Sequence, residues 1–411
     1  MNRLAILITV IIILSAYLVP QSKIKVMSYN LLNYPGMDTT IRNPYFRTVI
    51  NSVQPDILVA QEILSKSGLD GFLKNVMNSS GNIYSAGSYI EDPNNDIAVF
   101  YKTKEFTFIN VTTIYTNQKN ISEFRIKYNS SEDTLILFSL HLKPGPGSSI
   151  EADRGKEIDS LRKVTDKLPL SANFLVIGDF NTNGSNEPYY HKLLDQSKSG
   201  YSIDPIFMTG IWNSAANSIY HTRSTRIRSF GGGLPGGLSY RSDMILYSKS
   251  VSEQAGITYV PGSYTVYGND GNHFNDSINM LLNTAVSLDM ANALYYASDH
   301  LPVLVTLKFN KVVNVEKEKI NNIAKGFYLY QNYPNPFNPS TNIKYEIPQN
   351  SMVKISVFDL LGKEIETLIN EEQPSGKYEL IYNAGNLPSG IYFYCLRSGN
   401  YIAVKKMILL R

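Results

Sequence analysis

Five short segments of this chain place carboxylate, amide or imidazole side chains directly beside apolar runs typical of β-strands. They are 26–30 (VMSYN), 56–62 (DILVAQE), 135–141 (LILFSLH), 176–183 (VIGDFNTN) and 298–303 (SDHLPV). The end of a strand is where a sheet delivers polar groups to the rim of a pocket. Because these groups can bind a divalent cation and transfer protons, the pattern indicates cleavage of phosphoesters.

The order of these polar residues along the chain resembles the endonuclease/exonuclease/phosphatase superfamily, which includes DNase I-like nucleases, abasic-site endonucleases, inositol-phosphate phosphatases and bacterial sphingomyelinases. The matching residues, in order, are Asn30, Glu62, His141, Asp179 with Asn181, Asp243, and Asp299 with His300. The resemblance covers residues 23–310. It implies a DNase I-like α/β sandwich of two packed mixed sheets flanked by helices.

The resemblance also implies a metal site. Glu62 is expected to be the principal ligand of Mg²⁺, a hard cation that binds few protein carboxylates and keeps several waters, and Mn²⁺ is the alternative ion. Asn30 and Asp299 match the family's other metal-site positions, where they contribute directly or through water. A bound ion would polarise the phosphoryl oxygen or stabilise the leaving oxygen.

The remaining matched residues are expected to be catalytic. His300 can take a proton from water or act as a cation on the phosphate, and in the family the position of Asp243 orients it. Asp179 is the competing candidate for activating the attacking water, and the sequence leaves this choice open. Asn181 would donate its amide to the transition state, and His141 would bind the phosphate or protonate the leaving oxygen.

Each of these residues has a structural alternative when it is taken alone. Asn30 could be a turn residue, Asp179 and Asn181 could cap a local loop, and His141 could bind backbone at a strand end. Their joint occurrence in the family's order favours the catalytic interpretation. Among the other histidines, His191 and His221 are expected at the surface, and the role of His273 is left open.

Four arginines flank the glycine-rich segment 230–237 (FGGGLPGG), and they are Arg223, Arg226, Arg228 and Arg241. Guanidinium groups suit phosphate, so these residues could form an edge that follows a nucleic-acid backbone. A solvated flexible loop is an equally weighted alternative.

Polar residues also crowd the segment 268–276 (GNDGNHFND). It could bind Ca²⁺ or form a lid over the site, but we favour a chain of Asx turns that leads into a helix from Ile278.

Helical spacing of apolar residues predicts helices over 43–54, 69–77 and 158–168. Strands that alternate with these helices indicate the α/β class.

The chain begins with a short basic start and an apolar run over 4–19, which predicts an export signal over 1–22. An uncleaved N-terminal anchor is the alternative. The formal net charge of +3 over 411 residues does not by itself imply a polyanionic partner. Cys395 is the single cysteine, so stability must come from a packed core and not from disulfides.

The C-terminal part is predicted to be a separate unit. Residues 311–326 are charged and are expected to be a linker, and 327–411 is expected to form a small all-β sandwich. Its strands are predicted over 353–358, 378–382, 391–396 and 401–410. The segments 333–337 (YPNPF), 387–392 (LPSGIY) and 405–410 resemble the type IX secretion system C-terminal sorting domain. A carbohydrate-binding or adhesion sandwich is the alternative.

These observations predict a secreted, metal-dependent phosphodiesterase that is exported through the periplasm and outer membrane to the cell surface or the medium. A nuclease acting on extracellular DNA or RNA is preferred. A phosphatase or a sphingomyelinase-like phospholipid hydrolase is the alternative, although the one tryptophan, Trp212, offers no aromatic cluster for membrane docking. A catalytically silent surface adhesin is the alternative from another class.

Overall fold

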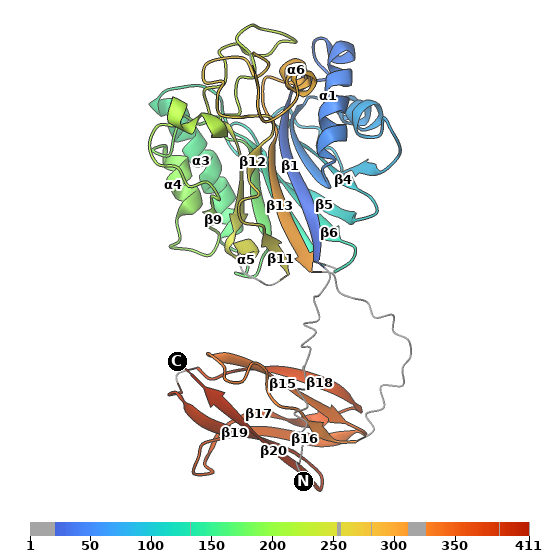
Figure 1. Cartoon of the computed structure of the whole chain (residues 1–411), viewed down its shortest axis with the longest axis vertical. Coiled ribbons are helices and arrows are strands. Elements are labelled where there is room, and N and C mark those ends of the chain that lie inside the picture. Colours follow the sequence, from blue (N-terminus) through green and yellow to red (C-terminus); the bar gives the residue numbers. More distant parts are fainter. Residues whose placement is uncertain are drawn as a thin grey trace, which may run out of the picture. The chain divides into compact units, whose positions relative to one another are not determined.

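A computed structural model of the chain describes residues 21–131, 133–252, 256–280, 282–310, 326–385 and 387–410. The predicted export signal, apart from its last two residues, and the predicted linker, apart from its last residue, lie outside these ranges. The chain divides into two compact units, residues 1–313 and 314–411, and each is described by itself (Figure 1). Within the described ranges, no helix combines the length and the apolar character that a membrane span requires.

The first sheet of the N-terminal unit follows the order β11-β13-β1-β2-β4-β3, with β12 also paired to β13. β1 and β2 are parallel, and β1 pairs antiparallel with β13. The strands are β1 (Gln21–Tyr34), β2 (Ile57–Ile63), β3 (Tyr84–Ala86), β4 (Ala98–Lys102), β11 (Ile257–Tyr259), β12 (Thr265–Val266) and β13 (Val303–Asn310).

The second sheet of this unit follows the order β5-β6-β7-β8-β10-β9. β7 and β8 are parallel, and β10 pairs antiparallel with β8. The strands are β5 (Phe106–Ile114), β6 (Ile121–Tyr128), β7 (Thr134–His141), β8 (Phe174–Asp179), β9 (Ser202–Ile203) and β10 (Asp243–Ser248).

The two sheets pack face to face because β8 is apolar on both of its faces. Leu175 and Ile177 join the central core together with residues of the first sheet, whereas Phe174 and Val176 point to the opposite face and join a second core. Alternate side chains of a strand point to opposite faces, so one strand contributes to both cores. This arrangement is the predicted α/β sandwich, and the fold class is confirmed.

Helices cover the outer faces of both sheets (Figure 1). Phe46 of α1 and Leu69 of α2 belong to the core of the first sheet, and Ile158 of α3 and Tyr190 of α4 belong to the core outside the second. The helices are α1 (Thr39–Val53), α2 (Lys66–Phe72), the π-helix η1 (Leu73–Met77), α3 (Ser148–Thr165), α4 (Pro188–Leu194), the 3₁₀-helix η2 (Ala215–Tyr220), α5 (Lys249–Ser252) and α6 (Leu288–Ala297).

The three predicted helices are present with shifted boundaries, but the predicted helix from Ile278 is wrong. Turns follow Ile278, and α6 begins at Leu288, where the Ser287 hydroxyl accepts a hydrogen bond from the Met290 N–H as an N-cap. The Asx turns predicted before Ile278 do form, since the Asn269 and Asp270 side chains accept hydrogen bonds from backbone N–H groups two residues ahead.

The C-terminal unit is all-β, as predicted, with one sheet of order β14-β15-β18 and one of order β17-β16-β19-β20. Apolar side chains from both sheets form one core, which includes Ile343 and Tyr382 from the first and Val357 and Tyr394 from the second. The strands are β14 (Tyr328–Leu329), β15 (Ser340–Ile347), β16 (Ser351–Phe358), β17 (Glu364–Gln373), β18 (Gly376–Asn383), β19 (Gly390–Ser398) and β20 (Tyr401–Leu409).

Candidate active site

The strand registers explain why polar residues far apart in the sequence meet. His141 and Asp179 are partners at the carboxyl ends of parallel β7 and β8, and Asp243 at the start of antiparallel β10 pairs with Asp179. In the other sheet, Asn30 is aligned with Gln61, next to Glu62, on parallel β1 and β2. The two sheets thus bring these groups to one edge of the sandwich.

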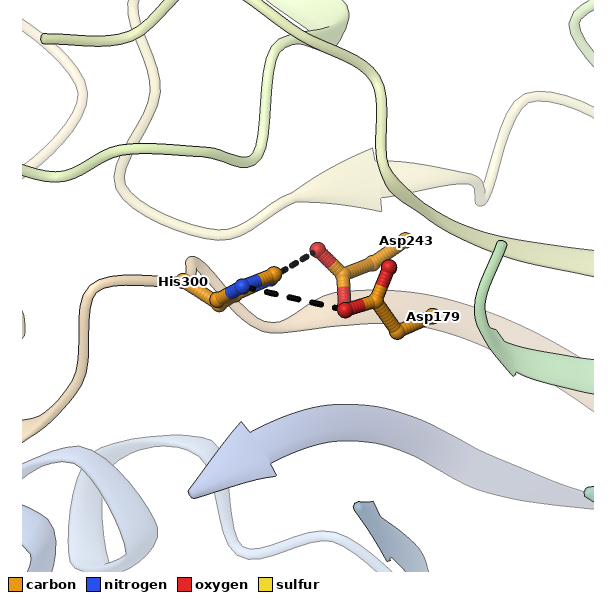
Figure 2. Close-up of side chains that lie close together, drawn as sticks. All are labelled: Asp179, Asp243 and His300. Atoms are coloured by element: carbon orange, nitrogen blue, oxygen red, sulfur yellow. Dashed lines mark hydrogen bonds and ion pairs between the residues drawn. The ribbon is translucent and has the colours of Figure 1, made fainter. Parts of the chain in front are cut away.

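His300 forms a buried pair with Asp243 (Figure 2). Its Nδ1 lies 2.7 Å from Asp243 Oδ2, and its Nε2 lies 3.8 Å from Asp179 Oδ2. Burial disfavours the imidazolium, but the charges of Asp243 and Asp179 outweigh this and raise the pKa of His300 to about 9. His300 therefore carries a proton at neutral pH, with the ring oriented by Asp243.

Asp179 lies between the two site histidines. Its Oδ2 is 3.8 Å from His141 Nε2 as well as from His300 Nε2, and it accepts a hydrogen bond of 3.2 Å from Asn30 Nδ2. Burial and the nearby charge of Asp243 raise the pKa of Asp179, against the opposing effect of the histidines and of Arg223. This carboxylate is thus a stronger base than an exposed aspartate.

His141 has a partner that the sequence interpretation missed. Its Nδ1 lies 3.0 Å from Oδ2 of the buried Asp96, which is also ion-paired to Lys119 at 2.8 Å. Burial opposes the charge, but Asp96, Asp179 and Glu62 together raise the pKa of His141 to about 10. Asp96 stands just before the apolar run that becomes β4, so the pattern that identified the other site residues could have found it.

Asn30 organises the carboxylates around it. Its Nδ2 donates to Glu62 Oε1 at 2.8 Å as well as to Asp179, and its Oδ1 accepts from the Leu32 N–H at 2.9 Å. The second oxygen of Glu62 accepts from the Asn33 N–H at 2.7 Å. The structure therefore brings together Asn30 and Glu62, two of the three residues assigned to the metal site.

The third of these residues, Asp299, has a different local partner. Its Oδ2 accepts a hydrogen bond of 2.8 Å from the Leu234 N–H, and its charge helps to raise the pKa of the neighbouring His300. Asp179, Asp243 and His300 form a compact group that could also hold a metal ion, with ligand atoms within 4.8 Å of one another.

The donors at this edge fit a divalent cation. The carboxylates of Glu62, Asp179 and Asp243 supply the oxygen ligands that Mg²⁺ prefers, and Oδ1 of Asp243 is buried without a hydrogen-bond partner in the described structure. A buried carboxylate oxygen without a partner is costly, and a cation or an ordered water would relieve it.

Asn181 lies beside the same carboxylate, with φ of 49° in the left-handed region. Its N–H donates to Asp179 Oδ1 at 2.9 Å, and its Nδ2 donates to Leu142 O at 3.0 Å. An amide group has two N–H donors, so one stays available for a phosphate oxygen.

The four arginines assigned to substrate binding separate into two kinds. Arg226 and Arg241 are fully buried, which contradicts the expectation that they contact a nucleic-acid backbone. Arg241 holds Asp204 with two hydrogen bonds of 2.7 Å, and Arg226 donates to Phe230 O at 2.9 Å and stacks over Tyr295. Arg228 is exposed, and Arg223 is half-buried at the rim of the site.

The histidines outside the matched set have structural positions. His191 is exposed, as expected, but the expectation that His221 is at the surface is wrong, since it is fully buried with its Nε2 2.8 Å from Trp212 O. His273 is buried and lies 3.5 Å from Asp270.

Comparison with family models identifies both parts of the chain. Residues 27–300 match the model described as endonuclease/exonuclease/phosphatase family, and residues 331–410 match the secretion system C-terminal sorting domain. The chain therefore belongs to the endonuclease/exonuclease/phosphatase family, and it is a phosphoric ester hydrolase of a family in which metal dependence is typical. The C-terminal unit carries the sorting domain, so both resemblances seen in the sequence are confirmed.

Several solved structures with low sequence identity are similar to this chain over about 70% of its length. The human nocturnin catalytic domain with bound sulfate is 19% identical with a TM-score of 0.43, covering 70% of this chain and 94% of its own. TDP2 of D. rerio with a single-strand DNA product is 14% identical with a TM-score of 0.48, covering 70% and 99%. A family protein of Bacteroides thetaiotaomicron is 17% identical with a TM-score of 0.46, covering 71% and 99%. A search of curated proteins found no match.

Proposed function

We propose that this protein is a secreted, divalent-metal-dependent phosphodiesterase that hydrolyses extracellular DNA or RNA. The observation that supports this most is the position of Asp179, whose Oδ2 lies 3.8 Å from both His141 Nε2 and His300 Nε2. One basic carboxylate between two cationic imidazoles is suited to deprotonating a water while the cations hold an anionic phosphate.

The protonation state of each residue determines the catalytic role that we assign to it. Asp179, with its raised pKa, takes the proton of the attacking water. His300 already holds its proton at neutral pH, so it binds a phosphate oxygen as a cation while Asp243 fixes its ring. His141, charged and held by Asp96, protonates the leaving oxygen, and Asn181 donates its free N–H to the phosphate.

Glu62 would be the principal ligand of the metal ion, with Asn30 and Asp299 contributing directly or through water. Mg²⁺ or Mn²⁺ would supply charge neutralisation at the phosphoryl and leaving oxygens. Asn30 keeps the carboxylates of Glu62 and Asp179 close together through its two hydrogen bonds, in spite of their mutual repulsion. Asp299 would contribute to the same metal site while its Oδ2 accepts a hydrogen bond from the Leu234 N–H.

The sorting domain supports the location of this activity. A chain that carries it is addressed to the type IX secretion machinery, which implies the cell surface or the extracellular space. We propose that the predicted export signal over 1–22 directs transport across the inner membrane and that the C-terminal unit directs transport across the outer membrane. Residues 311–326 would link the catalytic domain to the sorting domain.

A parallel substrate panel tests the proposal. The full chain is incubated with labelled DNA, RNA, sphingomyelin and inositol phosphates, each with and without EDTA, beside an Asp179→Asn variant. We expect cleavage of nucleic acid that EDTA and the variant both abolish. Cleavage of only the lipid or only the inositol phosphates would move the chain to the corresponding alternative, and no cleavage of any substrate would favour the silent adhesin.

A further inference from the structure

A pocket of about 470 Å³ opens directly beside the catalytic groups. It adjoins Asn181 and Ser242, the neighbour of Asp243. Its volume is within the range of pockets that enclose small ligands. The lining residues come from the turn 144–146 after β7, the loop 181–183 after β8, and Tyr240 and Ser242 just before β10. Arg223 and Leu234 complete the lining.

A buried ion pair fixes two of these segments relative to each other. Arg154 of α3 is fully buried and donates from Nη1 to Lys143 O at 3.0 Å and to Gly145 O at 2.9 Å. Its Nε donates to Glu187 Oε2 at 2.8 Å, and the other oxygen of Glu187 accepts from the Asn183 N–H at 2.9 Å. The turn and the loop are therefore held by one charge-assisted network, and the pocket is preformed.

Arg223 is the one charged residue among those that line the pocket within the described chain. Its backbone is fixed, since its N–H donates to Tyr240 O at 3.2 Å and its carbonyl accepts from Tyr240 N at 3.0 Å. Its guanidinium has no hydrogen bond or ion pair in the described part of the structure. Arg223 differs in this respect from Arg226 and Arg241, whose guanidinium groups donate hydrogen bonds to Phe230 O and to the Asp204 carboxylate.

The rest of the pocket offers apolar and aromatic surface. Tyr240 is half-buried, and its ring pairs with no other aromatic ring of the described residues. Pro144 and Pro146 are exposed at the opposite segment, and Leu234 is 52% exposed at the edge. A free aromatic ring beside an unpaired guanidinium is the combination that binds a nucleobase by stacking and its phosphate by charge.

We propose that this pocket binds one unpaired nucleotide next to the scissile phosphodiester, with Tyr240 against the base and Arg223 on the adjacent phosphate. The proposal rests on the proposed nuclease function and adds the substrate class, which is single-stranded nucleic acid. A base within a duplex would have to leave its stack to enter a preformed pocket of this size, and unstacking costs a few kcal/mol. The bases of a single strand are already unpaired, so binding a single strand avoids the cost of breaking a base pair.

Binding without cleavage tests the proposal directly. The full chain in EDTA is titrated into a short fluorescein-labelled oligothymidylate and, separately, into a labelled duplex of the same length, with anisotropy as the readout. Arg223→Ala and Tyr240→Ala are each expected to weaken single-strand binding about tenfold, in line with the loss of one stacked base or one phosphate contact. Tyr240→Phe, which keeps the ring, should bind as the wild type does.

A control variant separates local from general charge effects. Lys163→Ala removes one exposed positive charge on α3, away from the pocket, and should leave single-strand affinity within about twofold of the wild type. Circular dichroism melting of each variant shows whether the fold is intact. In steady-state cleavage with Mg²⁺, Arg223→Ala should raise KM about tenfold and change kcat little, since the contact serves binding.

The outcomes distinguish this inference from the function on which it rests. Preference for single strands that Arg223→Ala and Tyr240→Ala remove would support the pocket. Equal binding and cleavage of single and double strands, or equal losses for Lys163→Ala and Arg223→Ala, would overturn it while the nuclease function stands. Absence of cleavage of any nucleic acid would overturn both.

Discussion

The carboxylate of Asp179 is in contact with each of the groups to which we assign a proton or a phosphate oxygen. Its Oδ2 meets Asn30 at 3.2 Å and the two histidines at 3.8 Å, while its Oδ1 is occupied by the Asn181 N–H. Asp179 therefore faces two imidazole rings, of which His300 is also paired with Asp243 and His141 with Asp96.

The pairing of Asp243 with His300 leads to a non-additive mutational effect. Because Asp243 orients the ring, Asp243→Ala and His300→Ala should each lower kcat by several orders of magnitude, and the double variant should lose little more. Steady-state kinetics of the three proteins measure this. Asn181→Ala should lower kcat and leave KM nearly unchanged, since its N–H serves the transition state. Strictly additive losses for Asp243→Ala and His300→Ala would show that the residues act independently.

Asp96 gives the site a pH dependence that can be assigned to one side chain. It helps to raise the pKa of His141 to about 10, so the imidazolium persists below that pH and is lost as the pH rises through it. Asp96→Asn removes this charge, and the alkaline limb of the kcat profile should move to lower pH. Asp92→Asn, four residues earlier and outside the site, is the matched control. An unchanged alkaline limb in Asp96→Asn would contradict a catalytic proton on His141.

The start of β10 depends on a buried ion pair. Arg241 and Asp204 are both without solvent exposure at their side chains and are joined by two hydrogen bonds of 2.7 Å, and Arg241 precedes Asp243 by two residues. This pair therefore holds the element that supplies a site carboxylate.

Removing one member of this pair should be costly. Asp204→Asn leaves the Arg241 charge buried, so we expect the free energy of unfolding in urea to fall by about 3–5 kcal/mol. Asp70→Asn is the comparison, because Asp70 forms an exposed (i,i+4) pair with Lys66, and it should cost less than about 1 kcal/mol. Equal small losses for both variants would show that the buried pair does not stabilise β10.

The elements predicted from the sequence were those with a periodic apolar pattern. The strands that carry His141 and Asp179 are apolar runs, and α1 shows Phe46, Val49 and Val53 on its buried face, so both kinds of element could be recognised. β17 was not predicted, because seven of its ten residues are Glu, Gln, Asn or Thr and the strand lacks a run of apolar residues. α6 was not predicted either, because its apolar residues are nearly continuous.

The site was predictable to the extent that its residues follow a known order in the chain. The order did not show which arginines are buried, because a guanidinium is ordinarily expected in water and only the packing places Arg226 and Arg241 inside. The order also did not show that Asp299 turns toward the Leu234 N–H, because that contact joins residues 65 positions apart.

The catalytic domain and the sorting domain belong to separate compact units, so export should be separable from catalysis. Deleting residues 327–411 should leave a folded, active enzyme that accumulates in the periplasm of a host with type IX secretion. Fractionation with activity assays of periplasm and medium measures this, and the intact chain is the control. Secretion of the shortened chain at the level of the intact one would contradict the sorting role.

Hydrolysis should depend on a divalent cation held at the edge where Glu62 meets Asn30 and Asp179. The most direct measurement is the cleavage rate of labelled single-stranded DNA by the full chain and by Glu62→Gln as Mg²⁺ or Mn²⁺ is titrated into EDTA-treated protein. We predict no activity without metal, saturation of the wild type, and for Glu62→Gln a much lower rate that high metal concentration partly restores. Full activity of the wild type in EDTA would show that hydrolysis needs no cation, and identical metal titrations for both proteins would show that Glu62 does not hold it.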